Sequence, residues 1–354
     1  MSQFTPNCLP LLIGSLPLTS HAEAAEMIFA HTPDIPIWPQ LPAFHEEGML
    51  LQFLPGLPGV RELDGKVFID TESTTFEEEV LAFYEEYLMV TEGAAPLETS
   101  RFLLSREAAR GFYAFLELAD KRGNLVGLKG QITGPITFCT SLVDQAGRAI
   151  FYNDQLRDVA VKHLALKARW QARKMTEICE RAIVFFDEPG LAGLGSSAFI
   201  TITKEDILSC FGEVFAAVRE ENGLTGVHVC ANTEWPVIFE SGVDIVSYDA
   251  YSFFDKLVLY KEHLVEFFAR GGILASGIVP TAPEFIDAET TDSLVAKWFA
   301  QTEQLQAIGI DRQKVLAQTL ITPSCGTGAV SRAQAEKVLE LTGEVSAKIR
   351  ASFA

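Results

Sequence analysis

Short apolar runs alternate with longer amphipathic stretches along almost all of the 354 residues. Compact apolar runs bounded by Gly, Pro or polar residues are typical of buried strands, whereas apolar residues spaced three and four apart are typical of helices. The pattern predicts eight strands, at residues 9–16, 35–41, 125–133, 181–189, 225–230, 243–251, 271–280 and 315–326. It predicts amphipathic helices between them, at residues 158–179, 204–223 and 254–272, and a last helix at 331–353 that begins after an N-cap serine.

Eight strands separated by helices favour an α/β fold, a single (β/α)8 TIM barrel, over an open doubly wound sheet. No linker rich in Pro, Gly or Ser divides the chain, so residues 1–354 are predicted to form one barrel domain. A long N-terminal insertion separates the second and third predicted strands. Within this insertion, the pattern predicts a short β segment at residues 65–73. It also predicts a helix at residues 76–88, with an acidic face exposed to solvent.

Composition excludes some classes of partner. Hydrophobic residues make up 48% of the chain, which is enough for a large core, and the net charge of −19 argues against a nucleic-acid or anionic-membrane surface. No apolar run reaches membrane-spanning length, and the first twenty residues lack the basic region of a signal peptide. We therefore expect a cytoplasmic protein. Its six scattered cysteines are expected to be thiols in a reducing compartment.

Metal-binding side chains fall at the ends of three predicted strands. The fifth strand ends at His228 and Cys230, which point to one face because side chains alternate along a strand. The sixth strand ends at Asp249 and the eighth at Cys325. Barrels place their chemistry at this end of the strands, and one imidazole, two thiolates and an exchangeable oxygen ligand suit catalytic zinc. The alternative is a core histidine beside a buried cysteine, the commoner meaning of an isolated H-x-C.

Two further predicted strand ends carry polar groups. The first strand ends in Ile13-Gly14-Ser15, and the fourth ends in Asp187-Glu188-Pro189. On their own, these motifs are better explained by structure than by function: the first as a strand-to-loop turn, the second as a carboxylate at a helix N-terminus preceding proline.

Five motifs together carry a resemblance to a known family. "LLIGSLP", "FFDEPGL", "HVC", "DIVSYDAY" and "PSCGTG" occur in the order found in the catalytic domain of cobalamin-independent methionine synthase, a member of the uroporphyrinogen decarboxylase-like superfamily. The resemblance extends over nearly the whole chain. It implies a zinc ion bound by His228, Cys230 and Cys325, and it places Asp249 where the family has a glutamate as fourth ligand.

The same resemblance implies how the substrate is held. It implies homocysteine as the thiol substrate, with Ile13, Gly14 and Ser15 contacting its carboxylate and Asp187, in a catalytic role, receiving its amino group. Zinc deprotonates a bound thiol, whose pKa is otherwise about 8.5. The sulfur is then able to attack a methyl group.

Three departures from the family concern the methyl donor. The chain has no room for the second, N-terminal barrel, "GPITFCTSL" lacks the tryptophan that stacks on folate, and "LASGIVPTAPEF" lacks the histidine that protonates the departing folate nitrogen. Similar short, single-barrel synthases are folate-independent. A methylated corrinoid protein is therefore the expected donor, because cobalt departs with its electron pair and needs no proton.

Three alternative functions stay open. A methyltransferase acting on coenzyme M would keep the same metal ligands, but its sulfonate would favour cationic groups, against which the acidic Asp187 argues. A uroporphyrinogen decarboxylase would need an arginine-rich N-terminal segment, and residues 9–29 contain no arginine. A zinc-binding barrel without turnover would transfer no methyl group from methylcobalamin.

Overall fold

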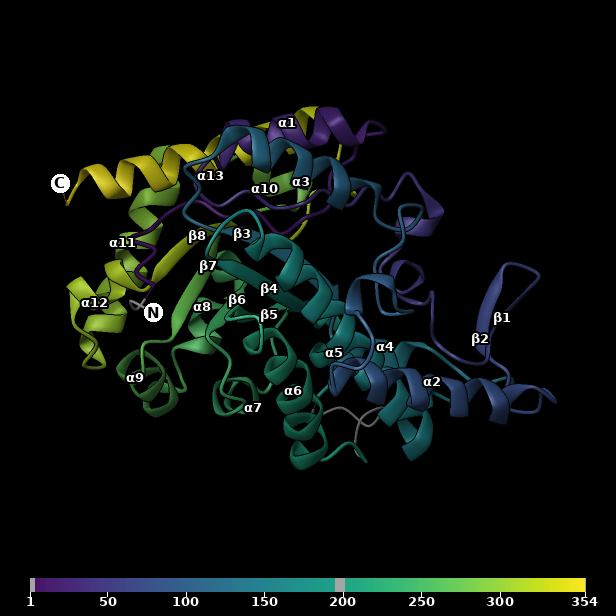
Figure 1. Ribbon diagram of the computed structural model, residues 1–354. Helices are drawn as coiled ribbons and strands as arrows, with labels where there is room; N and C mark the ends of the chain where they lie inside the picture. Colours follow the sequence, from purple (N-terminus) through teal and green to yellow (C-terminus); the bar gives the residue numbers. More distant parts are fainter. Residues whose placement is uncertain (1–3, 195–200, 354) are drawn as a thin grey trace.

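The centre of the protein is a curled sheet of six parallel strands, each hydrogen-bonded to the next one in the sequence (Figure 1). The computed structural model describes residues 4–194 and 201–353. The strands of this sheet are β3 (Leu128–Thr133), β4 (Ala182–Asp187), β5 (Leu224–Val229), β6 (Ile245–Tyr248), β7 (Ile273–Val279) and β8 (Thr319–Pro323). Each overlaps one of the last six strands predicted from the sequence, so this part of the prediction is confirmed.

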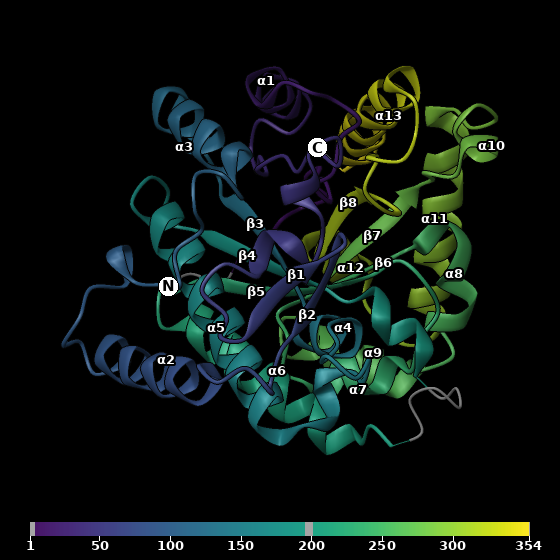
Figure 2. The same cartoon turned by 90° about the vertical axis from the view of Figure 1, so that its right-hand side faces the viewer.

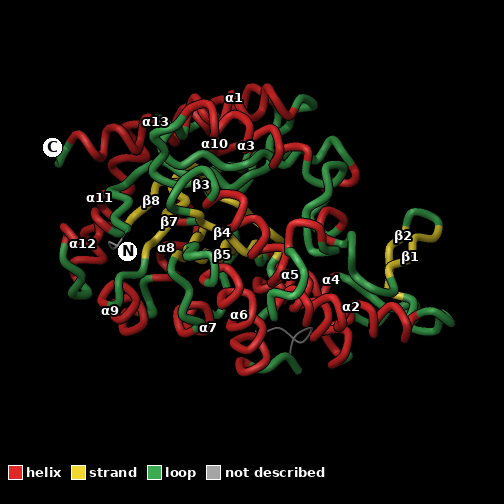
Figure 3. Tube along the Cα trace, viewed as in Figure 1, coloured by secondary structure: helices red, strands yellow, loops and turns green. Residues whose placement is uncertain are grey.

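The first two predicted strands differ from the prediction. Residues 9–16 and 35–41 are drawn as loop in Figure 3 and make only isolated parallel bridges. Prolines interrupt both segments, and a proline has no amide hydrogen to donate to a strand ladder. The bridges nevertheless join the two edges of the six-stranded sheet through these segments: Pro10 to Ile321, Ser15 to Gln40 and Ile37 to Lys129. A complete (β/α)8 barrel thus remains a prediction.

Helices connect successive strands and surround the sheet (Figure 2). The α-helices of the described residues are α1 (His21–His31), α2 (Phe76–Thr91), α3 (Arg110–Arg122), α4 (Pro135–Ser141), α5 (Asp154–Thr176), α6 (Lys204–Arg219), α7 (Trp235–Glu240), α8 (Ala250–Leu257), α9 (Lys261–Ala269), α10 (Pro283–Ile286), α11 (Thr291–Ala307), α12 (Arg312–Ala317) and α13 (Arg332–Ala351). The short 3-10 helices are η1 (His45–Glu47), η2 (Leu51–Phe53), η3 (Leu97–Thr99), η4 (Ile150–Tyr152) and η5 (Pro189–Gly193). No helix among residues 4–194 and 201–353 combines the length and apolar character needed to cross a lipid bilayer.

The predicted helices are found with one correction. The helix predicted at residues 254–272 is divided into α8 and α9 by a turn at Val258 to Tyr260. Leu259, at this turn, is 72% exposed, whereas Phe267 and Phe268 of α9 are buried. The turn thus allows α9 to bury its own apolar face. The sequence pattern predicts one continuous helix, without this change of direction. Ser331 caps α13 through a capping box with Gln334, as a serine at this position favours.

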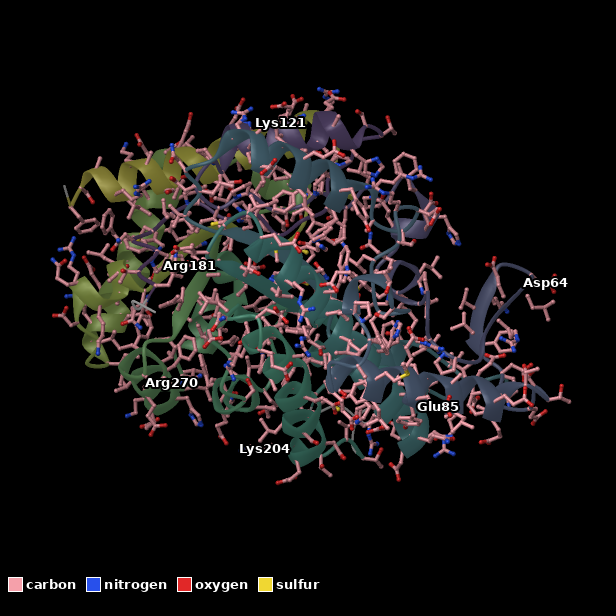
Figure 4. The ribbon with its side chains drawn as sticks, viewed as in Figure 1. Asp64, Glu85, Lys121, Arg181, Lys204 and Arg270 are labelled. Carbon is pink, nitrogen blue, oxygen red and sulfur yellow. The ribbon has the colours of Figure 1, made fainter. Side chains whose placement is uncertain are left out.

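The insertion before β3 contains a β-hairpin and a long helix. Strands β1 (Val60–Leu63) and β2 (Lys66–Ile69) pair antiparallel, in place of the single β segment predicted at 65–73. Asp64 and Gly65 both have positive φ, as a two-residue hairpin turn requires. The hairpin extends away from the body of the molecule, with Asp64 at its tip, and Glu85 on α2 also points outward (Figure 4).

Apolar side chains fill the space enclosed by the strands. Successive residues of a strand point to opposite faces, so alternate positions of β4, β6, β7 and β8 point inward. These inward residues form one buried cluster with residues of the N-terminal segment: Leu9, Leu11, Ile183, Phe185, Ile245, Ile273 and Leu320. The cluster closes the interior below the strand ends and gives the groups above it a rigid floor.

Candidate metal centre

His228, Cys230 and Cys325 lie together at the carboxyl ends of the strands. His228 is the last inward-pointing residue of β5, Cys230 follows this strand, and Cys325 lies in the loop after β8. One ligand atom from each lies within 4.8 Å of the other two. Zinc bonds to Cys and His are ~2.0–2.3 Å long, so a movement of about 1 Å would bring all three atoms onto one ion.

The imidazole of His228 is oriented for a ligand. Its Nδ1 lies 2.9 Å from the hydroxyl of Ser247 on β6, and its Nε2 is buried without a hydrogen-bond partner. When Nδ1–H donates to Ser247, the lone pair of Nε2 is left free for a metal, which is the usual arrangement of a metal-binding histidine. A buried nitrogen without a partner is costly unless something binds it. The three residues therefore fit a zinc ion.

The two cysteines shift each other's pKa in opposite directions. Proximity to Cys325 and His228 lowers the pKa of Cys230 to about 4, while the contact with Cys230 and burial raise the pKa of Cys325. Two cysteine sulfurs beside an imidazole are the donor chemistry that a borderline-soft metal such as zinc prefers.

Asp249, the predicted fourth ligand, has a structural role in the protein. Its side chain is the N-cap of α8 and accepts a hydrogen bond of 2.8 Å from the backbone N–H of Ser252. It does not belong to the group of three potential ligands. Burial raises the pKa of Asp249, and the nearby Cys230 adds to this shift. Its assignment as a ligand remains a prediction.

A cavity of about 230 Å³ opens beside the three potential ligands. It is lined by Ile13, Ser15, Gln40, Pro42, Glu47, Gly48, Met49, Thr133, Asp187, Pro189, His228, Cys230, Cys325 and Gly326. Asp187, at the end of β4, pairs in register with His228 of β5. Burial raises the pKa of Asp187, opposed by His228 and Lys129, and its Oδ1 is buried without a hydrogen-bond partner. The cavity therefore has a carboxylate oxygen free to bind a cationic or hydrogen-donating ligand.

The Ile13-Gly14-Ser15 turn forms another wall of the cavity. The carbonyl of Ser15 accepts hydrogen bonds from the N–H and the hydroxyl of Thr327, and its Oγ accepts one of 3.2 Å from the N–H of Gly328. Ile13 and Ser15 line the cavity, whereas Gly14 lies beside it against Gln131. These contacts tie the turn to the loop that carries Cys325.

Glu188, beside Asp187, has a structural role. Its buried carboxylate accepts hydrogen bonds from the backbone N–H groups of Ile136 and Thr137, of 2.9 and 2.7 Å, and from the hydroxyl of Thr137. Burial nevertheless raises its pKa to about 7. It therefore anchors the start of α4, and of the two adjacent carboxylates only that of Asp187 lines the cavity.

Two charged residues near the site were missed by the sequence reasoning. Glu47 lines the cavity and its carboxylate binds His21 Nε2 at 2.5 Å and the N–H of Leu41 at 2.8 Å. Lys129 points into the interior from β3 and is completely buried. Glu47 is the last residue of the short 3-10 helix η1, in a segment without a periodic pattern, so nothing in the sequence marked it. Lys129 could have been found, because Lys129, Gln131 and Thr133 alternate on one face of a buried strand.

Comparison with known proteins places the fold. A solved methyltransferase from Methanosarcina mazei is similar over 99% of both chains, with 16% sequence identity and a TM-score of 0.50. A B12-independent methionine synthase from Shewanella sp. W3-18-1, in complex with selenomethionine, is similar over 67% of both chains, with 17% identity and a TM-score of 0.46. The pneumococcal exo-β-D-N-acetylglucosaminidase StrH is similar over 96% of this chain and 85% of its own, with 10% identity and a TM-score of 0.43. No protein-family model and no curated protein matches the sequence. The similarity to the Methanosarcina protein concerns the fold alone.

Proposed function

We propose that the protein is a zinc-dependent methyltransferase that methylates the thiol of homocysteine to form methionine. The observation that carries the proposal is the buried, unpartnered Nε2 of His228, which lies beside Cys230 and Cys325 at the wall of a cavity. The fold shared with the Methanosarcina mazei methyltransferase is compatible with it.

One set of residues would hold the metal that binds the substrate sulfur. His228, Cys230 and Cys325 would hold the zinc, with Asp249 as the proposed fourth ligand. Bound zinc would keep the substrate sulfur as a nucleophilic thiolate at neutral pH. Ser247 orients the imidazole, and the loop after β8 holds the Cys325 thiol close to it.

The charges of the cavity favour an amino acid as the thiol substrate. The charged side chains that line it among the described residues are Asp187 and Glu47, apart from the potential metal ligands, and no Lys or Arg lines it. A free carboxylate oxygen on Asp187 suits an ammonium group. A sulfonate such as that of coenzyme M would be repelled. Ile13, Gly14 and Ser15 are proposed to receive the carboxylate of the amino acid.

The surroundings of α4 favour a corrinoid protein as the methyl donor. Phe138, in the segment where the family carries its folate-stacking tryptophan, is completely buried in the core. No Phe, Tyr or Trp is found among the described residues that line the cavity, so folate lacks a stacking surface there. A cobalt leaving group needs neither a stacking surface nor a proton donor.

The deciding experiment measures metal and methyl transfer on the same preparation. Zinc-loaded protein and homocysteine are incubated with methylcobalamin or with methyltetrahydrofolate at equal concentration, and methionine is measured. We expect one zinc per chain and methionine from methylcobalamin alone. Equal use of the folate would refute the donor. Methylation of coenzyme M but not homocysteine would favour the thiol alternative, and zinc binding without turnover would favour a binding protein. Full zinc retention in the Cys230→Ser, Cys325→Ser double variant would refute the metal site.

Asp187→Asn tests the amino-acid end separately. The substitution removes the charge but keeps the shape, so homocysteine should bind about 10- to 100-fold more weakly, as expected for loss of a charge-assisted hydrogen bond. Zinc content should be unchanged, because Asp187 is not in the metal-binding group. Isothermal titration of homocysteine into zinc-loaded wild type and variant measures the difference, and equal affinities would contradict the assignment.

A further inference from the structure

Lys129 is a buried cation directly inside the sheet. It points inward from β3, is completely buried, and its Nζ donates a hydrogen bond of 2.9 Å to the carbonyl of Ile13. The same Nζ lies 4.3 Å from the ring centre of Phe185. Burial lowers the pKa of Lys129 to about 7, against the opposing charge of Asp187. A methionine would fill this volume without the cost of burying an ammonium group. A lysine at this position therefore indicates that its ammonium group has a role.

This role concerns the irregular segments at the edge of the sheet. Residues 9–16 and 35–41 make few strand-type hydrogen bonds, and two side chains of β3 bind their carbonyl groups instead. Lys129 binds Ile13, and Gln131 Nε2 donates to the carbonyl of Trp38 at 3.1 Å. Ile13 and Ser15 of this turn line the cavity. The ammonium group beneath the turn is thus one of the groups that fix the position of this wall.

Lys129 binds the turn and leaves the carboxylate of Asp187 free. Its Nζ donates a hydrogen bond to the carbonyl of Ile13, whereas Oδ1 of Asp187 is buried without a hydrogen-bond partner. The Asp187 carboxylate oxygen thus stays available to a ligand in the cavity.

We propose that Lys129 is a positioning residue for the amino-acid end of the thiol substrate, because its ammonium group holds the Ile13-Gly14-Ser15 turn in place through the carbonyl of Ile13. This inference rests on the proposed function. It predicts that Lys129 affects the binding of the amino-acid group and leaves the binding of the thiol to the metal centre unchanged.

The test compares two thiols on zinc-loaded protein. L-Homocysteine has the amino and carboxylate groups, and 1-propanethiol has the thiol without them. In Lys129→Met, the Kd of homocysteine should rise about 10- to 100-fold, the loss expected for a hydrogen bond to a charged group, while the Kd of propanethiol is unchanged. Lys129→Arg, which keeps the charge, should recover most of the homocysteine affinity. If Lys129→Met does not fold, Lys129→Gln takes its place with the same expectation.

The chain offers a matched control in Lys167 of α5. Lys167 is also completely buried, burial also lowers its pKa to about 7, and its Nζ also donates to a carbonyl, that of Leu103 at 2.9 Å. It does not line the cavity, so Lys167→Met should bind both thiols like the wild type. Hydrogen exchange should quicken in residues 9–16 and 325–330 of Lys129→Met and not of Lys167→Met.

The outcomes separate this inference from the proposed function. Unchanged homocysteine affinity in Lys129→Met, or equal weakening of both thiols, would overturn the role of Lys129 while leaving the proposed function intact. Wild-type protein that binds no thiol would refute the proposed function and, with it, the role of Lys129. Selective weakening of homocysteine, recovered by Lys129→Arg, supports the proposal.

Discussion

Gly326 gives the sharpest test of how the Cys325 loop is built. A Cβ atom at this position would lie 2.1 Å from Ser15 Oγ. Van der Waals contact needs roughly 3.5 Å, so in Gly326→Ala either Ser15 or the loop must shift by more than about 1 Å. Rotating the Ser15 hydroxyl away would break the hydrogen bond that it accepts from Gly328, and keeping that bond would push the turn and the loop apart, so either response disturbs the contact between the two segments. We expect the thiol of Cys325, one residue away, to leave its place beside Cys230.

The size of the effect follows from the cost of overpacking. Forcing a methyl group into a packed site typically costs about 1–3 kcal/mol. If the strain is relieved by displacing Cys325, zinc affinity falls by the same free energy, about 5- to 150-fold. Competition with a chromophoric chelator measures this range directly.

A second variant tests the stated cause. Gly326→Ala combined with Ser15→Ala removes the clashing oxygen, and the next nearest atom, Ser15 Cβ, is 3.3 Å from the new methyl group. Zinc affinity should therefore recover, even though the variant lacks a proposed substrate contact. Gly212→Ala, on α6 with no atom within 4 Å of the new Cβ, is the control and should bind zinc like the wild type. Wild-type affinity in Gly326→Ala, or no recovery in the double variant, would refute this reasoning.

Two further predictions concern residues that support the site. Ser247→Ala removes the partner of His228 Nδ1, so zinc affinity measured by chelator competition should fall at least about 10-fold; an unchanged affinity would show that Ser247 does not orient the ring. Glu188→Gln places an amide group against the donors of Ile136 and Thr137, so thermal unfolding should begin about 2–5 °C lower with zinc content unchanged. A variant as stable as wild type would contradict the role of Glu188 in anchoring α4.

The regular part of the fold was predictable because its signals are local. The apolar runs of β3 to β8 are bounded by turns, and the N-cap residue Ser331 marks the start of α13. The first two strands were not correctly predicted, because an apolar segment with prolines satisfies the same pattern whether or not it forms a ladder. Likewise, the break between α8 and α9 was not predictable, because it depends on how neighbouring elements pack against the apolar side chains of α9.

Local sequence pattern was enough to indicate which side chains lie at the strand ends. His228 and Cys230 must share a face because strand side chains alternate, and parallel strands bring their carboxyl ends to one side. Three other features follow from the folding of distant segments onto one another: Cys325 lies beside His228 and Cys230, Asp187 lines the cavity while Glu188 anchors a helix, and Lys129 binds the turn from beneath. The physical reason is that periodicity acts over neighbouring residues, whereas burial, hydrogen-bond partners and unpaired buried atoms are set by segments up to about three hundred residues apart, such as Ser15 and Gly328.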